Sequence, residues 1–208
     1  MIRESREPLT NLYLLAARAW NFLTRPQSAW QSLGPPPGAW YLPLLYYVLP
    51  LALLPALGWA LGTAYFPIAD STAINPVAQP SGIAFIAALF ELVSKTALLY
   101  LISVVLLATA IFCVSPMYRV ARDWTRSVEI AAYGSTPMLL AGVLLLWQIL
   151  IVVSLVAFIP SCYVVYLGLQ IRLACHHDAA IGFVAVAMVV AILVSMLFGA
   201  LMGALGLV

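Results

Sequence analysis

Five long apolar stretches, separated by short polar segments, dominate the hydrophobic pattern of this chain. They cover about residues 40–66, 83–114, 127–147, 150–171 and 181–207. A transmembrane α-helix needs about 20 consecutive apolar residues to cross a hydrocarbon core of about 30 Å. The stretch 83–114 is longer than this, because about 32 residues of helix extend about 48 Å, so we expect it to tilt or to begin outside the core. The pattern predicts an all-α, polytopic membrane helix bundle with five transmembrane helices.

The third and fourth spans must share one nearly uninterrupted apolar region. Between residues 127 and 171 the only charged side chain is that of Glu129. Two spans of about 20 residues joined by a tight turn fit this length, whereas a single span does not. Trp147 and Gln148 give a weak turn signal at the middle. Pro160 is then interpreted as a kink within the fourth span.

The basic residues indicate the orientation of these spans. The chain has nine Lys and Arg residues, and in a five-span arrangement eight of them (4 + 3 + 1) fall on one side of the membrane. These are Arg3, Arg6, Arg18 and Arg25 before the first span, Arg119, Arg122 and Arg126 after the second, and Arg172 after the fourth. Short cytoplasmic loops carry an excess of Lys and Arg. We therefore expect a cytoplasmic N-terminus and a periplasmic C-terminus.

Composition supports the membrane class and excludes others. The chain is 65% hydrophobic and 8% charged, with a mean hydropathy of +1.08, whereas soluble domains are about 45–50% apolar and about 25% charged. The net charge of +2 is small and scattered, so nucleic acid is not an expected partner. The expected domains are a cytosolic N-terminal segment, 1–39, and a five-span membrane domain, 40–208. The lipid bilayer is the expected surrounding.

The N-terminal segment contains an amphipathic helical pattern between residues 11 and 25. One face carries Leu12, Leu15, Ala16, Ala19 and Leu23, and the other carries Asn11, Arg18, Asn21 and Arg25, with Leu14 intruding on the polar side. A helix of this kind lies in the membrane interface with its arginines toward anionic headgroups. Two roles stay open: it anchors the first span, or it docks a partner.

The segment AAYGSTP places polar and helix-breaking residues inside the third span. Its candidate kink consists of Tyr133, Gly134, Ser135, Thr136 and Pro137. Proline removes the donor that would pair with the carbonyl of Tyr133, and the hydroxyls of Ser135 and Thr136 can satisfy freed carbonyls. The kink either shapes packing alone or forms a polar pocket that recognises a ligand.

Two further groups are candidate sites. Small residues recur every four positions in the last span, at Ala187, Ala191, Ser195, Gly199 and Gly203, which predicts a helix-packing stripe against another helix of this chain or against a second copy. Glu91 and Lys95 are spaced as an i, i+4 ion pair. We expect this pair at the membrane interface, with interhelical packing and an ion relay as alternatives.

The sequence contains little that indicates a catalytic site or a metal site. Cys175, His176, His177 and Asp178, together with Cys113, are candidate metal ligands, but adjacent residues point apart on a helix and zinc sites use wider spacings. No Ser/His/Asp set, HExxH or phosphate loop occurs in the sequence. We therefore expect no enzyme activity, no catalytic residue, no metal and no cofactor.

The order of three motifs resembles the Yip-one domain family of five-span membrane proteins. They are FLTRPQSAWQSL before the first span, RSVEIAAYGSTPMLLAGVLLL in the third and YVVYLGLQI in the fourth, and the resemblance covers residues 21–208. It implies a multi-spanning protein without established catalytic residues. Eukaryotic members resemble trafficking adaptors that bind Rab-type GTPases through long cytosolic N-terminal regions, whereas this chain has about 39 residues there and is more similar to bacterial inner-membrane members.

Three functional classes follow from these patterns. The favoured one is a membrane-organising scaffold or adaptor, with other membrane proteins or a second copy as partners. The alternative is a small transporter or channel-like protein that uses the kinked third helix as part of a pathway. An intramembrane enzyme ranks third, because no catalytic pair at a shared depth is visible.

Overall fold

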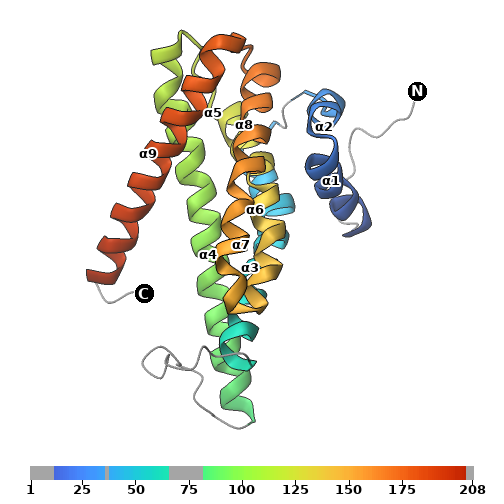
Figure 1. Cartoon of the computed structure of the whole chain (residues 1–208), viewed down its shortest axis with the longest axis vertical. Coiled ribbons are helices and arrows are strands. Elements are labelled where there is room, and N and C mark those ends of the chain that lie inside the picture. Colours follow the sequence, from blue (N-terminus) through green and yellow to red (C-terminus); the bar gives the residue numbers. More distant parts are fainter. Residues whose placement is uncertain (1–11, 36–37, 66–81, 205–208) are drawn as a thin grey trace.

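The protein is an all-α membrane bundle in the computed structural model, which describes residues 12–35, 38–65 and 82–204 (Figure 1). No strand occurs among these residues. Within the described ranges, five helical segments are long and apolar enough to cross a membrane: Leu44–Thr63, Ile83–Tyr118, Trp124–Leu146, Ile151–Arg172 and His177–Leu197. The loop expected between the first two spans lies outside the described residues, apart from Gly82.

Prolines shape the first span. A π-helical turn, Leu44–Val48, follows Pro43 and leads into α3, Leu49–Tyr65, which contains Pro55. Pro55 has no backbone N–H to donate, so it removes one bond of the helical ladder. On the following turns, the backbone of α3 approaches that of the third span. A Cβ on Gly58 would lie 2.5 Å from the carbonyl oxygen of Gly142, and a Cβ on Gly62 would lie 2.5 Å from that of Leu145.

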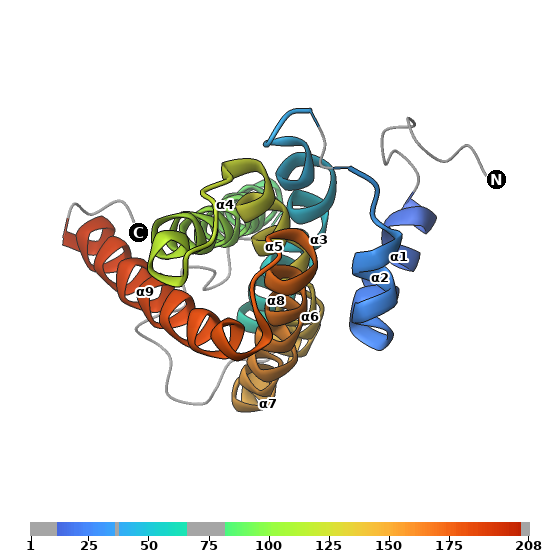
Figure 2. The same cartoon turned by 90° about the horizontal axis from the view of Figure 1, so that it is seen from above.

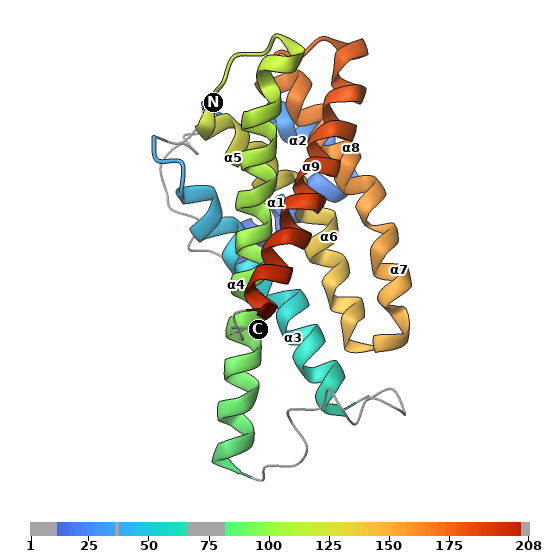
Figure 3. The ribbon, with the colours of Figure 1, turned by 90° about the vertical axis from the view of Figure 1, so that its left-hand side faces the viewer.

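The second span is the longest helix of the bundle. Helix α4, Ile83–Val114, continues into a 3-10 turn, Ser115–Tyr118, that ends at Arg119 in the left-handed conformation. Its first turns extend past the ends of α3 and α7 (Figure 3). Asp123 then begins the third span, because its carboxylate accepts a hydrogen bond from the backbone N–H of Arg126 at 3.0 Å.

The third and fourth spans are each broken near a proline. The third comprises α5, Trp124–Gly134, and α6, Thr136–Ala141, followed by a 3-10 segment, Gly142–Leu146. The chain reverses at Trp147, which has an extended backbone. The fourth span consists of α7, Ile151–Val156, and α8, Phe158–Arg172, and it breaks at Ala157. Pro160 cannot donate to the carbonyl of Val156, so the break lies just before it.

The last helix begins earlier than the sequence pattern indicates. Helix α9 covers His177–Ala204, whereas the apolar run predicts a start near residue 181. The carbonyl of His176 accepts bonds from the N–H groups of Ala179 and Ala180, so the polar residues of the turn already form the first helical turn. The connection after α8 is therefore short, and it contains Ala174 at a positive φ of 51°.

A helical hairpin precedes the bundle. Helices α1, Leu12–Thr24, and α2, Pro26–Ser32, lie on one side of it and α9 lies on the opposite side (Figure 2). The buried face of α1 carries Leu15, Ala19 and Phe22, whereas Leu23 is exposed. The sequence pattern placed Leu23 on the apolar face and left Phe22 out, because periodicity does not reveal which of two neighbouring apolar residues meets the bundle.

Candidate functional site

The hairpin is docked on the kinked third span through three aromatic rings. We call the group of Tyr47, Tyr133 and Thr136, on which Phe22 and Trp30 of the hairpin dock, the kink socket. The ring of Phe22 stacks on that of Tyr133 with centroids 4.8 Å apart, and Trp30 meets Tyr133 edge-on at 5.8 Å. Trp30 is 0% exposed and Phe22 is 1% exposed. Fully buried aromatic side chains dominate the energetics of a contact, so these rings fix the hairpin to the bundle.

Trp30 also binds the fourth span. Its indole Nε1–H donates to the carbonyl of Val164 at 3.0 Å. A Cβ on Gly168 would lie 2.7 Å from the Trp30 ring, so the glycine leaves the space that the indole fills. Gly134 similarly lets the third span approach Val165, whose side chain occupies the place of a Cβ. The small residues of the third and fourth spans therefore form part of the site.

The kink itself is held by hydroxyl groups. Thr136 Oγ1 donates to the carbonyl of Tyr133 at 2.6 Å, and Ser135 Oγ donates to that of Ala132 at 3.0 Å. Since the Thr136 proton is used in this way, the hydroxyl of Tyr47, 2.7 Å away, donates to Thr136 Oγ1. All five candidate kink residues thus lie at or next to the socket. The carbonyl that Pro137 leaves without its helical donor is the one that Thr136 satisfies.

Arg18 points into this site. Its Nη1 donates to the hydroxyl of Tyr133 at 3.2 Å, and the side chain is half-buried. The amphipathic pattern predicts this arginine on the face toward lipid headgroups, and that prediction is wrong for Arg18. The reason is tertiary: burial of Phe22 brings α1 against the third span, where the phenol oxygen of Tyr133 can accept a bond.

A buried ion pair lies between the third and fourth spans and holds the segment after the hairpin. The Glu129 carboxylate accepts two bonds from the guanidinium of Arg172, one of them from Nε at 2.8 Å. Only 3% of the Glu129 side chain and 12% of the Arg172 side chain are exposed. Arg172 Nη2 also donates to the carbonyl of Gly34 at 2.9 Å. A bidentate pair of this kind fixes geometry strongly, so it ties the link behind α2 to the bundle.

The other predicted site residues lie elsewhere. In α9, Ala187 and Ala191 are buried and Ser195 is half-buried, and α9 packs on α4 and α8. The surroundings of Gly199 and Gly203 lie outside the described side chains. Glu91 Oε1 lies 2.8 Å from Lys95 Nζ, and both side chains are exposed. Neither group takes part in the kink socket.

The residues of the CHHD turn have individual partners. The Cys175 thiol is buried, and burial raises its pKa, which disfavours the thiolate that binds metal. Nδ1 of His177 lies 2.6 Å from the hydroxyl of Tyr166 and 3.0 Å from Nε2 of Gln170. His176 Nδ1 lies 3.7 Å from a carboxylate oxygen of Asp178. Over the residues with described positions, no three metal-ligating side chains come together.

Several of these residues carry signals that the sequence interpretation did not use. Glu129 is the only charge before Arg172 in the shared apolar region, and two isolated opposite charges in such a region favour pairing. Gly58 and Gly62 have the small-xxx-small spacing of close helix contacts. Phe22 and Trp30 have no comparable local signal, because their partners are distant in sequence.

Comparison with known proteins identifies the family of this chain. The family model described as Yip1 domain matches residues 20–202. It includes the end of α1, from residue 20, all of α2 and the five spans, and therefore every residue of the kink socket. No curated protein and no solved structure matches the chain. Since the family model covers most of the chain, this protein belongs to the Yip1 domain family.

Proposed function

We propose that this protein is a non-enzymatic scaffold or adaptor of a bacterial inner membrane. The observation that carries the proposal is the docking of the α1–α2 hairpin on the kink socket. A hairpin anchored by buried aromatic rings presents its outer surface in one fixed orientation, and preorganised surfaces lose little entropy when a partner binds. In this role the membrane spans form the platform and the hairpin forms the presented element.

The same contacts favour a scaffold over a transporter. The hydroxyls of Tyr47 and Thr136 bond to each other, and that of Thr136 also bonds to a carbonyl. Among the described residues, no buried side-chain nitrogen or oxygen lacks a hydrogen-bond partner. Polar groups that serve a solute pathway face a cavity, whereas those of the kink are occupied by their neighbours. The kink is therefore proposed as a docking element for the hairpin.

The proposed partners are other membrane proteins or a second copy of this chain. Beyond Ala191, α9 exposes Ile192, Leu193, Met196 and Leu197, and this apolar surface faces lipid or another helix. The N-terminus is proposed to be cytoplasmic and the C-terminus periplasmic, from the distribution of arginines. The hairpin then lies toward the cytoplasmic end of the bundle.

Purification from native membranes in mild detergent tests this function with two matched tryptophan variants. Trp30→Ala removes the buried anchor of the hairpin, while Trp20→Ala removes a tryptophan of the same hairpin that is 62% exposed. We expect the wild type and Trp20→Ala to retain the same set of co-purifying membrane proteins. In Trp30→Ala we expect at least one specific protein to be lost, because its binding surface is no longer held.

Two results would contradict the adaptor role. One is an identical set of co-purified proteins for Trp30→Ala and the wild type, provided that exchange measurements show the hairpin of the variant to be undocked. The other is solute flux through proteoliposomes that depends on Thr136, which would favour the transporter alternative instead.

A further inference from the structure

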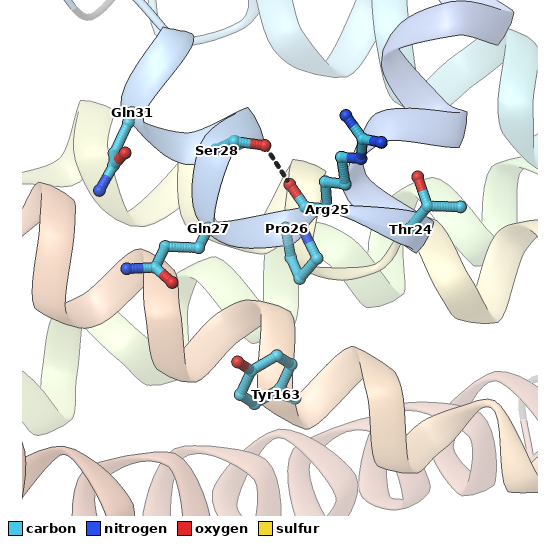
Figure 4. A pocket seen from close by; sticks show the side chains of 7 residues that line it. All are labelled: Thr24, Arg25, Pro26, Gln27, Ser28, Gln31 and Tyr163. Carbon is cyan, nitrogen blue, oxygen red and sulfur yellow. Dashed lines mark hydrogen bonds between the residues drawn. The ribbon is translucent and has the colours of Figure 1, made fainter.

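A polar groove lies where the hairpin turns beside the fourth span. It has a volume of about 540 Å³ and is lined by Thr24, Arg25, Pro26, Gln27, Ser28, Gln31 and Tyr163 (Figure 4). The hydroxyls of Ser28 and Thr24 donate to backbone carbonyls of the hairpin, those of Arg25 and Trp20. Among the described residues, no hydrogen bond or ion pair is made by the guanidinium of Arg25, the amides of Gln27 and Gln31 or the hydroxyl of Tyr163. These groups are free to bind a ligand.

The surroundings of the groove are apolar. Along the outer side of α7 and α8, Val152, Val156, Ile159 and Tyr163 are all more than half exposed and recur at helical spacing. The outer face of α1 is apolar as well, with Tyr13 and Trp20 exposed. Surfaces of this kind meet lipid acyl chains in a membrane bundle. The groove is thus a polar region bordered by lipid-facing surface.

The position of Arg25 along the bundle favours an anionic partner. Arg25 shares the groove with Tyr163, which precedes Arg172 at the polar end of α8 by nine residues (172 − 163), or about 14 Å of helix. An unpaired charge at such a depth is costly unless it reaches the headgroups or draws a headgroup to itself. Arginine suits this purpose because it binds phosphate oxygens through a planar fork of donors.

We propose that this groove binds one anionic phospholipid. Its phosphate lies on Arg25, the polar remainder of its headgroup lies on Gln27 and Gln31, and its acyl chains follow the exposed stripe of α7 and α8. Figure 4 shows the Arg25 side chain on one side of the α2 turn and the two amides on the other. That separation suits a headgroup with several polar groups better than a single phosphate ion. The inference depends on the docked hairpin and is independent of the adaptor role.

Native mass spectrometry of the intact protein in detergent, with added phosphatidylglycerol or phosphatidylcholine, tests the site. We expect phosphatidylglycerol to be retained in a 1:1 complex and phosphatidylcholine to be retained far less. Arg25→Gln should weaken phosphatidylglycerol binding by about tenfold, the scale of one charge-assisted hydrogen bond, and Arg25→Lys should recover part of the loss. Arg119→Gln is the matched control, because Arg119 is also exposed and its side chain has no acceptor among the described residues.

Three outcomes would overturn the proposal. Equal losses for Arg25→Gln and Arg119→Gln would show general attraction between a basic face and anionic lipid. Displacement of the lipid by millimolar inorganic phosphate would show an ion site instead of a lipid site. Should Arg25→Gln fail to fold, Gln27→Ala combined with Gln31→Ala keeps every charge and is expected to weaken binding about threefold. Unchanged affinity in that double variant would rule out the headgroup contact.

Discussion

Single residues hold the break in the third span together. Pro137 frees the carbonyl of Tyr133, and the hydroxyl of the preceding residue, Thr136, satisfies it at 2.6 Å. The same hydroxyl accepts a bond from Tyr47 of the first span. One oxygen atom, Thr136 Oγ1, therefore satisfies the carbonyl that Pro137 leaves unpaired and also links the third span to the first. The ring of Tyr133 contacts Phe22 and Trp30.

Thr136→Val is the variant that tests this arrangement. Valine keeps the shape of threonine but leaves the carbonyl of Tyr133 and the hydroxyl of Tyr47 without a partner, so we expect a loss of about 1–3 kcal/mol in unfolding free energy. Ser135→Ala is the control, because Ser135 is half-buried, and it should change stability by less than about 0.5 kcal/mol. Unfolding in detergent measures both. Similar losses in the two variants would show that Thr136 has no special role.

The location of the break could be predicted from the sequence, but its surroundings could not. A proline acts on the carbonyl four residues before it, so Pro137 and Pro160 mark their kinks locally. In contrast, Trp30 bonds to Val164 across 134 positions and Arg172 bonds to Glu129 across 43. Contacts of this range depend on how the spans pack, which hydrophobic periodicity does not determine.

At the scale of helices, a close backbone approach joins the first span to the third. Gly58 and Gly62 face the carbonyls of Gly142 and Leu145, and Gly142 in turn meets Pro55. Apolar surface does not drive helices together in lipid, so such small-residue contacts are a main source of association. The sequence pattern directed attention to the stripe in α9, because it is longer there, whereas the contact between the first and third spans uses only two glycines of α3.

Gly58→Ala is expected to separate these two spans. Its Cβ would lie 2.5 Å from the Gly142 oxygen, and a backbone atom cannot move aside as a flexible side chain can, so we expect a loss of about 1–3 kcal/mol. Gly38→Ala is the control, since nothing lies within 4 Å of an added Cβ there. Thermal unfolding in detergent compares them. A Gly58→Ala protein as stable as the control would show that the spans can move apart without cost.

At the scale of the whole molecule, the two ends of the bundle differ in charge. The arginines of the loops after α4 and α8 gather at one end, where Arg126 Nη1 donates to the carbonyl of Arg172 at 2.7 Å. Toward the other end, α4 carries the exposed pair of Glu91 and Lys95. The count of five spans was predictable because length and composition alone limit it, and the described helices agree with it.

Single-cysteine labelling tests the proposed orientation. After replacement of Cys113, Cys162 and Cys175, one cysteine is placed at Arg122 and, in a separate variant, one at Ala84, both of which are exposed. An impermeant thiol reagent added to intact cells should label position 84 and should reach position 122 only after permeabilisation. Labelling of position 122 but not of position 84 in intact cells would show the opposite orientation. Labelling of both positions would show that α4 does not cross the membrane.

The long sequence separation between Trp30 of the hairpin and its acceptor in the fourth span has a consequence for the order of biosynthesis. Trp30 is made early, but its acceptor Val164 follows 134 residues later, which takes roughly 7–27 s at typical translation rates. During this interval Phe22 and Trp30 lack the partners that they have in the third and fourth spans. The hairpin can dock only after the third and fourth spans have entered the bilayer side by side, so its protection from protease reports that insertion of the newly made chain has reached the fourth span.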